Sequence, residues 1–281
     1  MGGGTLYVVA TPLGHLGDLS LRAAELFRTV SVVAAEDTRR TRTLLSHLGV
    51  HPRLISYHAH SKPGVAARIL SILREGQDVA LVSDAGTPAI SDPGAALVAE
   101  VRSSGYPVVP LPGPSAVATA LSAAGLPADR YVFLGFLPRK GMERARLLER
   151  IAKEELTSVL FEAPGRVGEL LVDLAASCGA DRHAVVAREL TKLHEEFRPG
   201  TLGELAEAFG TATPPRGECT VVIAGVTRGA EELPAERAEQ AARRLLTAGV
   251  SRRETVSMLS ELFGVARNDA YRLVTELSSA P

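Results

Sequence analysis

Short apolar runs alternate with amphipathic stretches along the first half of the chain. The apolar runs are bounded by turn-forming residues, a pattern typical of buried strands, whereas the stretches between them have helical periodicity. Strands are expected at residues 5–10, 31–35, 53–56, 78–82 and 108–111. Helices are expected at residues 21–29, 41–48, 64–74, 95–102 and 115–124. This alternation predicts a doubly wound parallel sheet.

The second half of the chain alternates less regularly, and it predicts another α/β domain with a mixed sheet. Its strands are expected at 131–135, 158–161, 183–187 and 218–224, and its helices at 141–152, 167–178 and 203–208. Residues 229–234 have the composition of a linker, and 235–277 predict two or three helices, one capped by Ser251 and Glu254. We therefore expect α/β domains at 1–114 and 115–228, and a helical extension at 229–281.

Composition narrows the class of protein. No uninterrupted apolar run reaches the length of about 18 residues that suggests a membrane span, and the N-terminus lacks the features of a secretory signal. Cys178 and Cys219 are far apart in the sequence, which favours a reducing, cytoplasmic setting. His58 and His60 have no third group of ligands beside them, so no metal site is expected.

The charge of the chain gives no general affinity for nucleic acid, because the formal net charge is −1 and the isoelectric point is about 6.7. A nucleic-acid partner would have to be met by local basic clusters. Two such clusters stand out, and each could contact phosphates or simply lie at the surface: Arg39, Arg40 and Arg42, and Arg139, Lys140, Arg144 and Arg146.

Residues 83–94, with the sequence SDAGTPAISDPG, form the most informative stretch. They follow a strand of the parallel sheet, and open α/β sheets bind ligands at the carboxyl ends of their strands. Glycines allow the backbone to approach a ligand closely, and prolines restrict the loop to one shape. Because the stretch contains no Lys or Arg, it suits a neutral or cationic ligand, such as S-adenosylmethionine, better than a triphosphate.

Three loops rich in Pro and Gly, at 11–18, 83–94 and 111–115, together resemble those of the tetrapyrrole methylase superfamily of S-adenosylmethionine enzymes. Residues 35–39, 160–166, 188–192 and 216–218 are similar to segments of its bacterial 16S rRNA ribose 2′-O-methyltransferases, which modify a cytidine of the decoding centre. The resemblance covers nearly the whole chain. It departs from the family at Gly165, where histidine is common.

The resemblance implies two α/β domains with S-adenosylmethionine in the cleft between them, a homodimer, and 16S rRNA of the small ribosomal subunit as partner. It also implies which residues contact the cofactor. In the first domain and at its end these are Pro12, Asp84, Ala85, Gly86, Pro88, Ser115 and Ala116. In the second domain they are Phe161, Glu162, Ala187, Arg188, Gly217, Glu218 and Thr220.

The expected reaction is an in-line displacement in which a ribose 2′-oxygen attacks the sulfonium methyl group, with its proton removed by a base. Candidate groups include carboxylate bases, a lysine that could act as base or hold a phosphate, and arginine clamps for phosphate or ribose. In that order they are Glu36, Asp37, Glu162 and Glu195, then Lys192, then Arg39 and Arg166.

Several alternatives remain open at the level of sequence. Glu36 and Asp37 could instead form a helix cap with an ion pair to Arg39 or Arg40, and the charges from Arg188 to Glu195 could form a solvated helical face. The whole chain could also be a tetrapyrrole C-methyltransferase or a non-catalytic RNA binder in ribosome assembly. A dinucleotide dehydrogenase is the least favoured, because no G-x-G-x-x-G motif follows the first strand.

Overall fold

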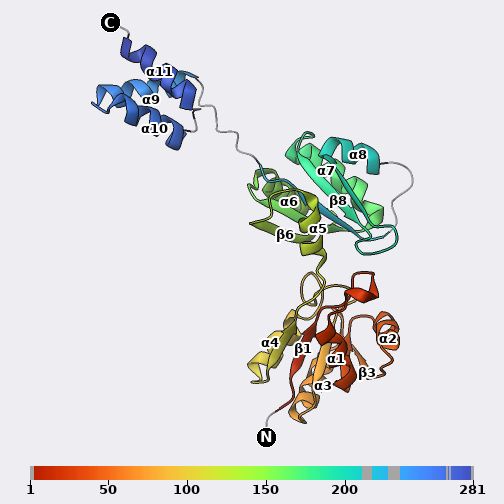
Figure 1. The fold of residues 1–281 in the computed structure, drawn as a ribbon. Helices are drawn as coiled ribbons and strands as arrows, with labels where there is room; N and C mark the ends of the chain where they lie inside the picture. The colour runs from red at the N-terminus through yellow and green to blue at the C-terminus, as the bar shows by residue number, and fades with distance from the viewer. Residues whose placement is uncertain (1–2, 211–216, 227–234, 264, 266, 280–281) are drawn as a thin grey trace. The chain divides into compact units, whose positions relative to one another are not determined.

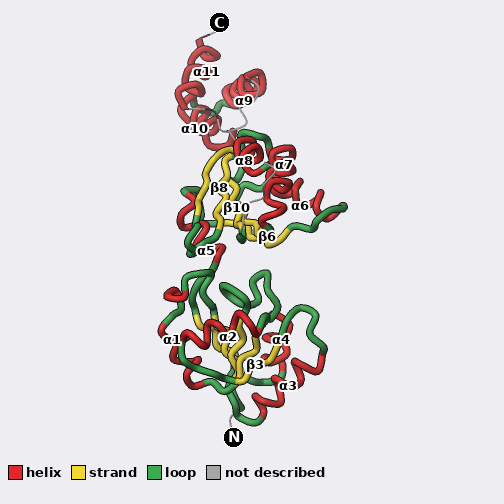
Figure 2. The backbone as a smooth tube through the Cα atoms, turned by 90° about the vertical axis from the view of Figure 1, so that its right-hand side faces the viewer, coloured by secondary structure: helices red, strands yellow, loops and turns green. Residues whose placement is uncertain are grey.

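The protein was analysed as a computed structural model that describes residues 3–210, 217–226, 235–263, 265 and 267–279. The chain divides into two compact units, Met1–Gly225 and Val226–Pro281. The first unit contains two five-stranded sheets with helices around them, so the expected α/β fold class is confirmed. Figures 1 and 2 show the strands of each sheet and the helices of the second unit.

All five strands of the first sheet run parallel, in the order β3-β2-β4-β1-β5, as the alternating pattern predicts. These strands are β1 (Leu6–Val9), β2 (Val32–Ala35), β3 (Arg53–Ser56), β4 (Val79–Val82) and β5 (Val108–Leu111). The central strands β2 and β4 are buried at every position because helices cover both faces of the sheet.

Two helices pack on each face of this sheet. Phe27 of α1 and Leu45 of α2 are buried on one face, whereas Ile69 of α3 and Leu97 of α4 are buried on the other. These helices are α1 (Leu21–Thr29), α2 (Thr38–His47), α3 (Pro63–Arg74) and α4 (Ala95–Ser103), and a short 3-10 turn, η1 (Leu16–Asp18), precedes them. The loops after β1, β2 and β4 consequently lie side by side at the carboxyl edge of the sheet.

The second sheet is mixed, as expected, with the order β6-β7-β10-β8-β9 and only β6 and β7 parallel. Its strands are β6 (Tyr131–Phe136), β7 (Thr157–Glu162), β8 (His183–Arg188), β9 (Glu196–Thr201) and β10 (Cys219–Ile223). The accompanying helices are α5 (Ala116–Ala124), α6 (Met142–Lys153), η2 (Pro164–Arg166), α7 (Val167–Cys178) and α8 (Leu202–Phe209).

Two elements differ from the sequence-based expectation. Strand β9 is absent from it, because Pro199 and Gly200 lower strand propensity; both are tolerated here because β9 is the edge strand beside β8. Helix α2 begins at Thr38 and not at Thr41, because the Asp37 side chain accepts a hydrogen bond from the Arg39 N–H and caps the helix.

The second unit consists of helices α9 (Ala235–Thr247), α10 (Arg252–Phe263) and α11 (Arg267–Ser279) around a small core that includes Ala242, Leu259 and Val274. The expected capping box is confirmed: the Glu254 N–H donates to Ser251 Oγ, and the Ser251 N–H donates back to the Glu254 carboxylate. The expected linker at 229–234 lies outside the described residues. Among the helices that are described, none has the length and apolar character needed to span a membrane.

Candidate functional site

Two adjoining pockets lie where the carboxyl edge of the first sheet meets the second sheet. The first pocket has a volume of about 320 Å³ and mixes apolar walls with several carboxyl groups. No Lys or Arg belongs to its described lining, which consists of Leu13, Asp84, Ala85, Gly86, Thr87, Ile90, Asp92, Ser115, Ala116, Val117, Phe136, Phe161, Glu162, Ala163, Pro164, Glu218, Cys219 and Thr220. Its size is that of a small-molecule site.

The second pocket, of about 290 Å³, differs from the first because Arg40 and Lys192 belong to its lining. The two pockets share a wall formed by Leu13, Asp84, Ala85 and Glu218. The remaining lining residues of the second pocket are Thr11, Pro12, Gly14, Leu16, Thr41, Thr43, Leu44 and Ser83. A ligand in one pocket would therefore lie next to a ligand in the other.

The loop at 83–94 is held against the loop after β1. The Thr11 N–H donates to the Gly86 carbonyl and the Gly86 N–H donates to the Thr11 carbonyl, both at 2.9 Å. Gly86 has a φ of +77°, and a Cβ there would lie 3.3 Å from Leu13 Cδ2. The left-handed backbone favours glycine here, and any larger residue would also displace the Leu13 side chain.

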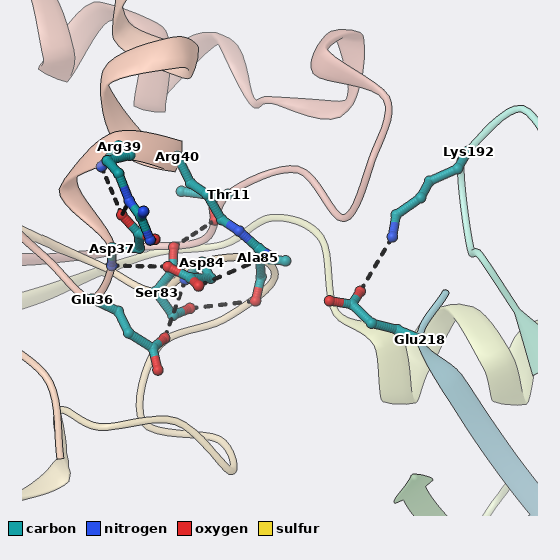
Figure 3. Close-up of polar contacts among 10 residues, drawn as sticks. All are labelled: Thr11, Glu36, Asp37, Arg39, Arg40, Ser83, Asp84, Ala85, Lys192 and Glu218. Atoms are coloured by element: carbon teal, nitrogen blue, oxygen red, sulfur yellow. Dashed lines mark hydrogen bonds and ion pairs between the residues drawn. The ribbon is translucent and has the colours of Figure 1, made fainter. Parts of the chain in front are cut away.

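Asp84 links the loop to the end of β2, as Figure 3 shows. Its Oδ1 accepts a hydrogen bond from the Asp37 N–H at 2.9 Å, and its own N–H donates to Glu36 Oε2 at 3.3 Å. Arg40 Nη1 lies 3.6 Å from Asp84 Oδ2. Burial, with a smaller contribution from the charge of Asp84, raises the pKa of Glu36, although the hydrogen bond from the Asp84 N–H acts in the opposite direction.

Asp37 forms the helix cap and the ion pair with Arg39 that the sequence left open as the alternative to a catalytic role. Arg39 donates two side-chain hydrogen bonds to Asp37, at 2.8 and 3.1 Å, while Asp37 also caps α2 (Figure 3). The side-chain hydrogen bond from Arg39, followed by the hydrogen bond from its N–H, lowers the pKa of Asp37 to about 2. A carboxylate of this kind is a weak base, and neither residue lines a pocket.

Glu162 is the most deeply buried of the candidate carboxylates, with a side chain that is 1% exposed. Arg166 Nη2 donates to its Oε2 at 2.8 Å, and the Ala163 N–H donates to its Oε1 at 2.7 Å. Both oxygens therefore have a donor within the protein. Glu162 lines the first pocket, whereas Arg166 does not belong to its described lining.

The segment from Arg188 to Glu195 is not a helical face. Arg188 ends β8 and forms an ion pair of 2.7 Å with Glu196 at the start of β9. Glu189 and Thr191 adopt left-handed backbone conformations in the turn that follows, with φ values of +52° and +62°. The Thr191 N–H donates to the Glu195 carboxylate, so Glu195 stabilises the turn and does not line either pocket.

This turn brings Lys192 to the second pocket. Its Nζ lies 2.8 Å from Glu189 Oε1 and 3.4 Å from Glu218 Oε2, the contact drawn in Figure 3. Although burial acts to lower it, the hydrogen bond to Glu189 and the charge of Glu218 raise the pKa of Lys192. Lys192 is therefore a cation in this arrangement, and of the two roles that the sequence leaves open, holding a phosphate fits it better than acting as a base.

Sequence reasoning missed Asp92, whose side chain lines the first pocket. Burial, and then the charges of Glu36, Asp84 and Glu218, raise its pKa to about 6, against the effect of a hydrogen bond from Ser83. The only sequence signal for Asp92 is its place in the loop at 83–94. Nothing in the sequence distinguishes it there from Asp84, which directly follows the strand.

The pockets bring together many of the residues expected to contact the cofactor or to take part in the reaction. Asp84, Ala85, Gly86, Ser115, Ala116, Phe161, Glu162, Glu218 and Thr220 line the first pocket, whereas Pro12 and Lys192 line the second. The other expected residues line neither pocket: Glu36, Asp37, Arg39, Pro88, Arg166, Ala187, Arg188, Glu195 and Gly217. Of these, Ala187 and Arg188 pair directly with Thr220 and Cys219 across β8 and β10.

Arg144, from the second of the two basic clusters, does not lie at the surface where it could contact a phosphate. Arg144 is 7% exposed and donates to the Asp173 carboxylate at 2.6 Å and to the Pro138 carbonyl at 3.0 Å. A guanidinium buried in this way joins α6 to α7 and is not available to a phosphate. Arg40 of the other cluster, in contrast, lies in the second pocket.

The chain is similar in sequence to one described family and to curated proteins of nearly the same length. Residues 5–206 match the family described as Tetrapyrrole (Corrin/Porphyrin) Methylases. The chain is 45% identical to ribosomal RNA small subunit methyltransferase I of Synechocystis sp., over 98% of this chain and 99% of that protein. It is 43% identical to the protein of the same name from Pseudomonas aeruginosa, over 97% of each.

A similar fold occurs in a solved structure of a distant relative. The uroporphyrin-III C-methyltransferase of Thermus thermophilus, crystallised with S-adenosylhomocysteine, aligns with a TM-score of 0.57 at 20% identity. The alignment covers 78% of this chain and 97% of that one. This likeness supports the fold assignment.

Proposed function

The chain belongs to the tetrapyrrole methylase family, and from that premise we propose that it transfers a methyl group from S-adenosylmethionine to a cytidine 2′-oxygen in 16S rRNA. Its relatives of nearly the same length are named ribosomal RNA small subunit methyltransferase I. The chain is accordingly an rRNA methyltransferase, and the cytidine ribose as acceptor and the decoding centre as target are the finer parts of the proposal.

The observation that carries the proposal is the pair of adjoining pockets with opposite charge character. The first combines apolar walls, including Phe136 and Phe161, with carboxyl groups and has no basic residue in its described lining. These properties fit a cationic cofactor that carries an aromatic base and ribose hydroxyls. The second pocket, which contains Arg40 and Lys192, fits a polyanionic nucleotide.

S-Adenosylmethionine would be held by the residues of the first pocket, and when bound it supplies a methyl group that is already activated for transfer. The task of the chain is then to align the ribose oxygen with that methyl group. Orientation of this kind can lower a barrier by about 7–11 kcal/mol in favourable cases. The shared wall at Asp84 and Glu218 is where the two reactants would meet.

Arg40 and Lys192 are proposed to hold the phosphates beside the target nucleotide. In the structure each is paired with an acidic residue of the shared wall, Arg40 with Asp84 and Lys192 with Glu218. These two contacts, at 3.6 and 3.4 Å, are long for ion pairs, so a phosphate could replace either of them, while Lys192 keeps its closer contact of 2.8 Å with Glu189. We further propose that the protein is a cytoplasmic homodimer that acts on the small ribosomal subunit.

The proposal is tested by transfer of a labelled methyl group from S-adenosylmethionine to small subunits that lack the modification. Naked 16S rRNA and a porphyrinogen serve as parallel acceptors. We expect label in subunit RNA, in a cytidine whose 3′ phosphodiester bond resists alkali. Label in the porphyrinogen alone would contradict the RNA substrate and favour a tetrapyrrole C-methyltransferase.

Replacing Arg40 or Lys192 with alanine is expected to raise KM for the subunit by roughly 10-fold or more, because each loses a charge-assisted hydrogen bond. The slope of log KM against log salt concentration should also fall by about one for each variant. Arg130→Ala is the matched control, because Arg130 is 78% exposed, pairs only loosely with Asp129 and lines neither pocket. A salt slope equal to that of the wild type would argue against phosphate contacts.

A further inference from the structure

We propose that Asp92 is the catalytic base that accepts the proton of the attacking ribose hydroxyl. This inference rests on the function proposed above. It assigns the step to a residue of the first pocket that sequence reasoning does not single out.

The backbone around Asp92 is held in an unusual conformation. Ala89 and Ser91 have φ values of +69° and +62°, in the left-handed region that residues other than glycine rarely adopt. Such conformations persist only where the surrounding structure enforces them, and they cluster at functional sites. The backbone that leads into Asp92 is therefore held in this conformation at an energetic cost.

Part of that enforcement comes from the second sheet. The pairing of β6 with β7 shifts register between Phe133 and Gly135, and Gly135 has a φ of +62°. A Cβ on Gly135 would lie 2.6 Å from Ser91 Oγ, so the bulge leaves space for the Ser91 side chain. Ser91, the residue before Asp92, therefore packs closely against the second sheet at Gly135.

Asp92 lines the first pocket together with Asp84 and Glu218, which belong to the wall that the two pockets share. Its charged neighbours are Glu36, Asp84 and Glu218, and the last two line both pockets. Two of these neighbours are themselves paired with cations, Asp84 with Arg40 and Glu218 with Lys192. Burial is the main reason that the pKa of Asp92 is raised to about 6, which is suitable for a base that works near neutral pH.

The other carboxylates considered as bases are less suited. Asp37 has a pKa lowered to about 2, and both oxygens of Glu162 already accept hydrogen bonds. Glu195 accepts a hydrogen bond from the Thr191 N–H, and Glu36 accepts one from the Asp84 N–H. Neither Glu195 nor Glu36 lines either pocket. Asp92 combines a place in the pocket with a raised pKa.

The step balances without another reactant. The hydroxyl proton passes to a carboxylate oxygen of Asp92 while the ribose oxygen forms a bond to the methyl carbon. The carbon–sulfur bond breaks, and its electron pair stays on sulfur, which leaves as the neutral thioether of S-adenosylhomocysteine. Asp92 then returns the proton to solvent and is ready for another cycle.

The test compares Asp92→Asn with the wild type on small ribosomal subunits. We expect kcat to fall by about 10²- to 10⁴-fold, the range typical of a lost general base, while affinity for S-adenosylhomocysteine changes by less than about 5-fold. Asp129→Asn is the control, because Asp129 is 81% exposed and lines neither pocket. A loss of S-adenosylhomocysteine affinity as large as the loss of kcat would overturn the proposal and assign Asp92 to cofactor binding.

A second readout keeps Asp92 intact. In the wild type, kcat/KM should rise with pH, with a midpoint near pH 6 and a plateau at higher pH, and so report the ionisation of a single base. Because the charge of Glu36 helps to raise the pKa of Asp92, Glu36→Gln should move that midpoint to lower pH. An unchanged midpoint would contradict the assignment. A wild-type enzyme that is inactive on subunits would instead refute the proposed function.

Discussion

Arg166→Ala is expected to lower the free energy of unfolding by about 3 kcal/mol, the lower end of the range for removing one partner of a buried ion pair. The change leaves the Glu162 carboxylate, 1% exposed, with only the Ala163 N–H as a donor. The cost arises mainly from an uncompensated buried charge. The loss of stability should therefore be larger than the net stabilisation that the Glu162–Arg166 ion pair provides.

Urea denaturation of three variants separates these contributions. The double variant Glu162→Gln with Arg166→Ala should recover much of the lost stability, because the amide is neutral. Arg243→Ala is the matched control: its pair with Glu239 is 61% and 42% exposed, and its loss should cost at most about 0.5 kcal/mol. If Arg166→Ala were as mild as the control, Glu162 would not depend on Arg166 for compensation.

Gly168→Ala is expected to destabilise the protein by about 2 kcal/mol, although alanine is normally the better helix former. Gly168 lies in the first turn of α7, directly after Arg166 and Val167. A Cβ there would lie 2.5 Å from the Phe209 carbonyl oxygen, so the backbones of α7 and α8 would have to separate. A backbone atom cannot rotate away as a flexible side chain can.

Gly64→Ala provides the matched control, because it also lies early in a helix, α3, and has nothing within 4 Å of its Cβ position. This change should stabilise the protein by about 0.5 kcal/mol through the lower entropy of the unfolded chain. In the same denaturation experiment, we expect the free energy of unfolding to fall for Gly168→Ala and to rise for Gly64→Ala. A rise for both variants would show that α7 and α8 can move apart at little cost.

Most strands and helices could be predicted from the sequence because their signals are local. The run Val79–Val82 is apolar throughout, as a central parallel strand requires, and Ser20 caps α1 as expected. Strand β9 could not be predicted in this way. Its residues, Glu196–Thr201, form a strand because they pair with β8. The local sequence of β9 alone does not indicate this pairing.

The candidate site, like the fold, could be predicted only where the sequence signal is local. The loop at 83–94 could be identified from its glycines and prolines, and much of it does line a pocket. The roles of individual charged side chains depend on contacts that composition does not reveal. Asp37 caps its own helix, and Arg144 is paired with Asp173. Asp92 owes its raised pKa to burial and to the charges of Glu36, Asp84 and Glu218.

We propose that the first pocket binds the cofactor and that the second receives the nucleotide. A crystal structure of the protein with S-adenosylhomocysteine would distinguish the two pockets. We expect the ligand in the first pocket, with its base near Phe161 and its sulfur toward Asp84 and Glu218 at the shared wall. S-Adenosylhomocysteine beside Arg40 and Lys192 in the second pocket would contradict both the pocket assignment and the role proposed for Asp92.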